Sequence, residues 1–217
     1  MKIYLASANK NEITQAYNMP IAGVLTNPTI LKKEKMGLEK LVYKIDQIGN
    51  KEFGLQIAAT NLKDMMDQAR LFKSLVKNRK LHLKIPFCLD AFKVIEKLKG
   101  TGVLLNLTAV SSMLQAVMAL ESEIDFLSIY VGRVTSAGGD GVELVKQVKH
   151  YANINNKNTK VVAASVHDTE NLEQVALAGA DAVAIPFPLL ESTLLNKVTE
   201  DSIKGFSDDW DQIEEIS

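Results

Sequence analysis

The chain of 217 residues is long enough to bury a sizeable core and falls in the range of a single domain. Its 25 Lys and Arg residues balance 26 Asp and Glu residues without a basic run, so the charge signature of a nucleic-acid-binding protein is missing. A single cysteine, Cys88, excludes an intrachain disulfide and a Cys-rich metal site. Because neither a secretory segment nor an apolar stretch of ~20 residues is present, we expect a cytoplasmic protein without a membrane partner.

Short apolar runs alternate along the chain with longer segments whose apolar residues recur at helical spacing. Eight runs are predicted strands: Lys2–Ala6, Ala22–Leu25, Phe53–Ile57, Leu81–Ile85, Val103–Leu107, Phe126–Val131, Lys160–Ala164 and Ala182–Ile185. The helical patterns between and after them cover Ile13–Tyr17, Leu38–Ile48, Leu62–Val76, Ala91–Leu98, Ser111–Leu120, Val142–Tyr151, Leu172–Ala178 and Leu189–Leu194.

This eight-fold alternation predicts an α/β fold, a single (β/α)8 TIM barrel over residues 1–217. A doubly wound open sheet is the alternative. The first strand is followed by Ala-Ser-Ala-Asn-Lys-Asn rather than by G-x-G-x-x-G, so a dinucleotide-binding domain has no support.

A ninth helical pattern closes the chain over residues 200–216, with Phe206, Trp210 and Ile213 at helical spacing. Each of the eight predicted strands already has a helical segment after it, so this C-terminal helix is additional to the barrel. We therefore expect it to pack across the barrel or on a neighbouring subunit.

Polar residues gather at the carboxyl ends of the predicted strands, whereas the strand interiors are apolar. In a TIM barrel these ends carry the catalytic and binding groups, so the asymmetry indicates an enzyme. The strand-end residues that we single out are Thr26, Asn27, Gln56, Lys84, Asn106, Thr108, Tyr130, Arg133 and Ser165.

Lys84 is the most informative of these residues because it lies between Leu83 and Ile85 in a predicted buried strand. Burial penalises the charged ammonium and lowers the lysine pKa, and a neutral amine attacks a carbonyl to form a Schiff base. The pattern therefore indicates a nucleophilic lysine. The alternative is a strand-end lysine whose ammonium reaches water along its aliphatic stem.

Four short motifs carry a resemblance to a known family: Leu83-Lys84-Ile85-Pro86, Thr26-Asn27-Pro28-Thr29, Tyr130-Val131-Gly132-Arg133 followed by Gly138-Gly139-Asp140-Gly141, and Ala163-Ala164-Ser165-Val166. In order and spacing they resemble the transaldolase family, and more closely its small subclass that includes fructose-6-phosphate aldolase. The resemblance runs from the first strand to Ile185-Pro186-Phe187.

The resemblance implies metal-free, cofactor-free aldol chemistry in which Lys84 forms the Schiff base with a sugar phosphate or a dihydroxyacetone-type ketose. It implies that Gln56, Thr108 and Tyr130 surround a water that transfers protons. It further implies a homo-oligomer, a pentamer or decamer in which the C-terminal helix reaches a neighbour. The substrate-binding residues would be Thr26, Asn27, Asn106, Arg133 and Ser165, with Arg133 and Ser165 as phosphate ligands and Asn27 either on substrate hydroxyls or capping the turn before Pro28.

The choice between aldolase and transaldolase stays open at this point. Gln56 and Tyr130 take the form found in the fructose-6-phosphate aldolase, whereas Asn106 follows the transaldolase pattern. The family carries an aspartate at the end of the first strand, and this chain has Ala6 there. The alternatives are therefore a true transaldolase of the pentose phosphate pathway, or a sugar-phosphate-binding relative of low activity.

Two histidines have expected places in the barrel. His82 shares a strand face with Lys84 and is expected to fill a layer inside the barrel. His167 follows Ser165 and could line the mouth, whereas neither it nor His150 fits a metal-ligand spacing.

Overall fold

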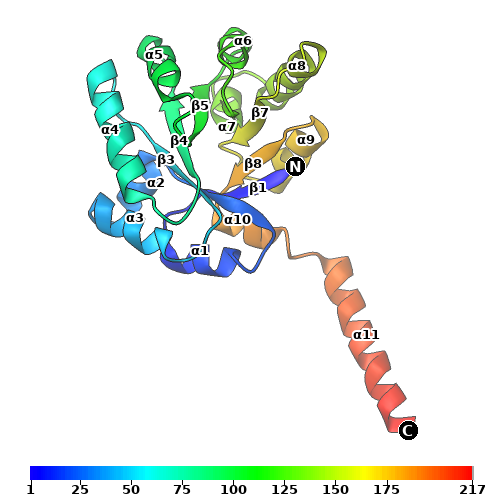
Figure 1. The fold of residues 1–217 in the computed structure, drawn as a ribbon. Coiled ribbons are helices and arrows are strands. Elements are labelled where there is room, and N and C mark those ends of the chain that lie inside the picture. Colours follow the sequence, from blue (N-terminus) through cyan, green and yellow to red (C-terminus); the bar gives the residue numbers. More distant parts are fainter. Residues whose placement is uncertain (217) are drawn as a thin grey trace.

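The computed structural model, which describes residues 1–216, is a closed barrel of eight parallel strands in sequence order (Figure 1). The strands are β1 (Lys2–Leu5), β2 (Ile21–Leu25), β3 (Glu52–Gln56), β4 (Leu81–Pro86), β5 (Leu104–Val110), β6 (Phe126–Tyr130), β7 (Lys160–Ala164) and β8 (Ala182–Ile185). Because β1 pairs with β8 over Lys2 to Leu5, the sheet has no free edge. The predicted TIM barrel is confirmed, and the open sheet is excluded.

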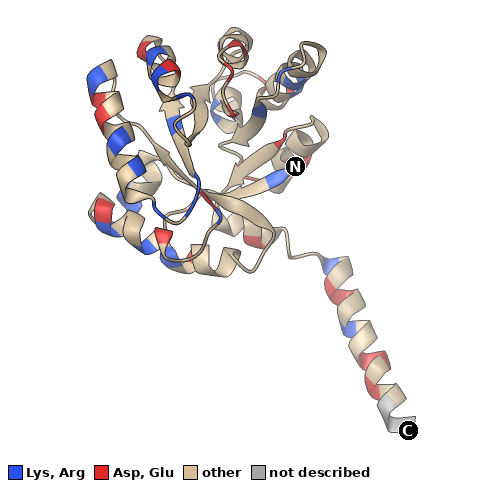
Figure 2. Ribbon diagram, in the orientation of Figure 1, with Lys and Arg blue, Asp and Glu red and all other residues tan. Residues whose placement is uncertain are grey.

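Helices surround the barrel and carry most of the charged residues, while the strands carry few (Figure 2). They are α1 (Lys10–Ala16), α2 (Pro28–Lys33), α3 (Leu38–Asp46), α4 (Leu62–Leu75), α5 (Leu89–Leu98), α6 (Met113–Glu121), α7 (Val131–Ser136), α8 (Gly141–Ile154), α9 (Thr169–Leu177), α10 (Phe187–Ser192) and α11 (Lys197–Ile216). No described helix is long and apolar enough to cross a membrane. The short helices α2 and α7 were not predicted, and both follow a strand within three residues.

The apolar core has two parts, as expected for strands buried on both faces. The larger part lies between the strands and the helix layer. The smaller part fills the barrel interior and consists of Tyr4, Leu25, Phe126, Val162, Ala182 and Ala184.

A polar cluster of Tyr4, Glu52 and His82 also lies inside the barrel. The Tyr4 hydroxyl donates to Glu52 Oε2 at 2.5 Å, and His82 Nε2 lies 2.7 Å from the same oxygen. The hydrogen bond from His82, with that from Tyr4, lowers the pKa of Glu52 to about 2 despite partial burial. His82 is fully buried one layer below Lys84, as predicted, and its ring contacts Tyr4 and Phe126.

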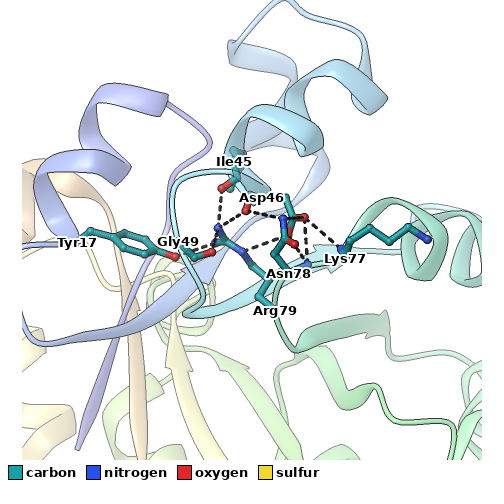
Figure 3. A network of polar contacts seen from close by, with 7 residues as sticks. All are labelled: Tyr17, Ile45, Asp46, Gly49, Lys77, Asn78 and Arg79. Carbon is teal, nitrogen blue, oxygen red and sulfur yellow. Dashed lines mark hydrogen bonds and ion pairs between the residues drawn. The ribbon is translucent and has the colours of Figure 1, made fainter.

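A second buried polar network joins α3 to the start of β4 (Figure 3). Arg79, whose side chain is fully buried, donates to the carbonyl oxygens of Ile45 at 2.7 Å and Asp46 at 3.0 Å, and its Nε lies 3.3 Å from Asp46 Oδ1. The Asp46 carboxylate in turn accepts from the backbone N–H groups of Lys77 and Asn78, both at 3.2 Å. A single ion pair thus fixes the loop that leads into the strand of Lys84.

The helix α11 extends away from the barrel, so the expectation that it packs across its own barrel is not met (Figure 1). The helix layer is complete without it, and residues 193–196 carry it outward. Its apolar side chains lie on exposed positions, with Ile203 63%, Phe206 72% and Ile213 59% exposed. Contact with a neighbouring subunit stays a prediction.

The network around Arg79 predicts a large effect of removing its carboxylate. We expect Asp46→Ala to lower the free energy of unfolding by about 3–5 kcal/mol, because it leaves a buried guanidinium uncompensated. Equilibrium denaturation in urea measures this loss. As the control, Asp67→Ala removes the exposed partner of Lys63 on α4 and should cost less than about 1 kcal/mol. Equal losses in the two variants would contradict the role given to Asp46.

Candidate active site

A cavity of about 420 Å³ opens where the strands end in the barrel mouth. Its walls come from strand ends and from the segments that follow β2, β6 and β7. No carboxylate of the described residues lines it. The lining residues are Ala6, Leu25, Asn27, Thr29, Ile30, Lys33, Lys84, Tyr130, Gly132, Arg133, Ser136, Ala164, Ser165, Val166, His167, Ala184 and Pro186.

Lys84 projects from β4 into this cavity and is only 6% exposed. Its Nζ donates one hydrogen bond, at 3.0 Å, to the backbone oxygen of Thr26. Burial lowers the pKa of Lys84 to about 8, because desolvation disfavours the ammonium. The lowered pKa raises the neutral fraction of the amine at neutral pH, and the neutral amine is the nucleophilic form.

Gln56 and Asn106 flank Lys84 on the neighbouring strands, since the sheet register aligns Gln56 with Lys84 and Lys84 with Asn106. The Asn106 Oδ1 accepts from the Ser128 hydroxyl at 2.7 Å. Gln56 Oε1, Asn106 Nδ2 and Thr108 Oγ1 are buried without a protein hydrogen-bond partner among the described residues. Buried polar atoms of this kind are costly, so their concentration beside Lys84 points to a functional site.

Thr26 and Asn27 lie at the end of β2, but they have different surroundings. Thr26 is fully buried, and its hydroxyl donates to the Gly54 carbonyl at 2.6 Å, so its backbone oxygen is the atom that meets Lys84. Asn27 lines the cavity, and its side chain also caps α2 by accepting from the N–H of Ile30 at 2.9 Å. Asn27 thus has a capping role, but it caps the helix that begins at Pro28 and not the turn before Pro28. Substrate contacts of Thr26 and Asn27 stay predictions.

Tyr130 and Arg133 form one wall of the cavity from β6 and α7. The Arg133 guanidinium carbon lies 4.5 Å from the centre of the Tyr130 ring, within range of a cation–π contact. Arg133 lies within the short helix α7 that directly follows β6.

Ser165 adjoins this wall in a strained conformation, with a φ of 61°. Its backbone oxygen accepts from the N–H of Gly132 at 3.0 Å, and a Cβ at residue 132 would lie 2.2 Å from that oxygen. Only glycine permits this approach. The Ser165 hydroxyl lies 3.1 Å from His167 Nε2, so His167 lines the mouth as the sequence suggested.

The end of β1 contributes Ala6 to the cavity wall. The next residue, Ser7, has its hydroxyl hydrogen-bonded to Glu12 on α1 and does not line the cavity. Neither Ala6 nor Ser7 therefore presents a polar side chain to the cavity.

Sequence reasoning missed the contribution of α2, which brings Thr29, Ile30 and Lys33 into the cavity. The spacing of these three residues is that of one helical face directly after Asn27-Pro28. Proline is favoured at the first position of a helix, so Pro28 was the available signal for a helix that begins there.

Comparisons with known proteins agree with this architecture. The family model described as transaldolase/fructose-6-phosphate aldolase matches residues 3–216. A probable transaldolase of Caldicellulosiruptor saccharolyticus is 31% identical over 98% of both chains, and one of Carboxydothermus hydrogenoformans is 32% identical over 97% of this chain and 98% of its own.

The fold also resembles that of more distant solved structures. A mandelate oxidase variant matches with a TM-score of 0.58 at 11% identity, over 85% of this chain and 64% of the oxidase chain. That likeness concerns the barrel fold alone. The matches to the family over nearly the whole length show that the chain belongs to the transaldolase/fructose-6-phosphate aldolase family.

Proposed function

We propose that the protein is a Schiff-base-forming enzyme that cleaves or transfers a dihydroxyacetone unit of a sugar phosphate. The observation that carries this proposal is Lys84, a buried amine with one backbone hydrogen bond and a lowered pKa at the floor of the cavity. A lysine kept only for packing would not need a cavity in front of its Nζ. The cation-lined mouth with no described carboxylate suits a phosphorylated substrate.

The proposed reaction begins when the neutral Nζ attacks the ketone carbon to give a carbinolamine, which takes up one proton from solvent and loses water to form a protonated imine. The imine accepts the electron pair of the neighbouring carbon–carbon bond as that bond breaks, while the substrate hydroxyl gives its proton to a base and an aldehyde departs. The enamine left on Lys84 is then protonated and hydrolysed, or it adds to a second aldehyde. In this scheme Gln56, Thr108 and Tyr130 position the water that moves the protons.

In the same proposal Asn27 and Asn106 contact substrate hydroxyls beside the imine, and Thr26 orients the Lys84 amine through its backbone oxygen. Arg133 and Ser165 bind the phosphate. If the enamine is protonated and hydrolysed, the enzyme acts as an aldolase. If the enamine adds to a second aldehyde, the enzyme acts as a transaldolase of the pentose phosphate pathway. Both outcomes use the same first steps.

We further propose a cytoplasmic homo-oligomer, a pentamer or decamer. Its support is the apolar stripe on α11 that includes Ile203, Phe206 and Ile213, all at least 59% exposed. A stripe of this size on an extended helix is typical of an interaction surface. The symmetry of the assembly rests on the family resemblance.

A second candidate is a barrel that binds a sugar phosphate without turning it over. Ala6 favours it, because the cavity offers no described carboxylate to accept the substrate proton. The buried amine of Lys84 favours the enzyme, since a binding protein has no use for a costly buried lysine.

The Schiff base makes the first prediction about activity. Borohydride in the presence of fructose 6-phosphate or dihydroxyacetone should leave a reduced ketose adduct on Lys84, detected by intact mass and peptide mapping, and Lys84→Met should abolish it. The trapping rate should rise with pH through about 8 and then level off, because only the neutral amine attacks. Lys93→Met on α5 is the control and should trap normally. An adduct on another lysine, or none with either ketose, would refute the proposal.

Arg133 supports a prediction about the phosphate. Arg133→Ala should raise KM for fructose 6-phosphate by roughly tenfold or more, the typical loss of a charge-assisted hydrogen bond, with little change for dihydroxyacetone. Steady-state kinetics with both donors tests this. Arg70→Ala, on α4, should change neither value. Equal losses with both donors would show that Arg133 has a structural role.

The position of Ala6 in the cavity wall gives a third prediction. Ala6→Asp should raise kcat for fructose 6-phosphate by at least about tenfold, because positioned acid–base groups typically contribute 10²–10⁴-fold. Ala6→Asn has the same shape without the base and should give no gain. Melting temperatures show whether either variant is destabilised by the new buried polar group. A folded Ala6→Asp that binds ligand without a faster rate would show that the proton already leaves by another route.

A further inference from the structure

Lys33 is a cation in the cavity wall to which the proposed reaction gives no role. It occupies the last turn of α2, is exposed, and lines the same cavity as Lys84 and Arg133. No carboxylate forms an ion pair with Lys33 among the side chains that the structure describes. Its charge is therefore available to a ligand in the cavity.

The barrel topology places Lys33 and Arg133 on opposite walls. The strands follow one another in sequence order around a closed barrel of eight, so β2 and β6 lie diametrically across from each other. Lys33 is on the helix that follows β2, and Arg133 is on the helix that follows β6. A group held in the middle of the mouth can therefore meet one cation from each side.

Charge matching indicates what that group is. A phosphate monoester carries about −1.5 to −2 at neutral pH. Arg133 alone offsets about half of that charge, and Lys33 can offset the remainder. Since no described carboxylate lines the cavity, no acidic side chain there competes for the two cations.

We propose that Lys33 is a specificity-determining residue that binds the terminal phosphate of the substrate from the wall opposite Arg133. This inference rests on the proposed function, which it deepens by dividing the recognition of the dianion between α2 and α7. Selectivity for phosphorylated over unphosphorylated substrates then depends on both helices.

A structural explanation of Lys33 also exists, because a cation in the last turn of a helix stabilises the helix dipole. Lys32 meets that description equally, since it is exposed, adjacent and in the same last turn, yet it does not line the cavity. The two lysines therefore form a matched pair in which only the position relative to the cavity differs.

The test compares kcat/KM for the addition of dihydroxyacetone to glyceraldehyde 3-phosphate and to glyceraldehyde. Lys33→Ala should reduce the value for the phosphorylated aldehyde by roughly tenfold and that for glyceraldehyde by less than about twofold, as for the loss of one charge-assisted contact. Lys33→Arg should retain most of the selectivity. Lys32→Ala should lower neither value by more than about twofold. Equal losses with both aldehydes, or the same result for Lys32→Ala, would overturn the proposal.

A binding measurement separates this inference from the Schiff-base chemistry. Glycerol 3-phosphate has no carbonyl and cannot react with Lys84, so its dissociation constant reports phosphate recognition alone. Calorimetry should show binding weakened by at least about fivefold in Lys33→Ala and unchanged in Lys32→Ala. A protein that traps no ketose but shows this difference retains the role of Lys33 and loses the proposed reaction. A protein that traps ketose on Lys84 but binds glycerol 3-phosphate equally in both variants loses only the role of Lys33.

Discussion

The cost of removing the Lys84 amine from water governs the layout of the barrel mouth. No carboxylate of the described residues lines the cavity beside Lys84, and burial is the cause that lowers the pKa of the amine. The neighbouring strands instead supply the neutral amides of Gln56 and Asn106. Glu52 lies deeper in the barrel than His82, and its carboxylate accepts from the Tyr4 hydroxyl and lies 2.7 Å from His82 Nε2. Tyr4 and His82 thus stabilise the Glu52 carboxylate inside the barrel, and it forms no ion pair with Lys84.

The two ends of the barrel perform different tasks. The network of Arg79 and Asp46 fixes the entry into β4 with a buried ion pair. The exit of β4 carries Lys84, and the neighbouring strands β3 and β5 carry buried polar atoms that have no partner among the described residues. The ion pair fixes the start of β4, and the Lys84 amine at its other end keeps a defined position with one hydrogen bond, to the Thr26 backbone oxygen. This separation of stability from chemistry is typical of TIM barrels.

The sequence was sufficient for the elements whose signal is local and repeated. Eight apolar runs separated by helical segments predict a barrel, and the structure has one. The alternation of side chains along a strand places His82 on the same face as Lys84, one layer below it. The helices α2 and α7 are six residues each and carry little apolar periodicity, so the signal for the cavity position of Lys33 was limited to Pro28 at the start of α2. The direction of α11 was also beyond prediction, because apolar periodicity identifies a buried face and not the partner that buries it. Thr26 is predicted to bind substrate, and the structure adds that its hydroxyl donates to the Gly54 carbonyl, a contact that the register of β2 and β3 reveals.

Closure of the barrel by β1 and β8 also has a consequence for biosynthesis. The partners Lys2 and Ala182 lie at opposite ends of the barrel sequence, so the sheet cannot close until β8 has been made. Pairing of such distant segments is slow, and strand edges left open during that wait invite aggregation.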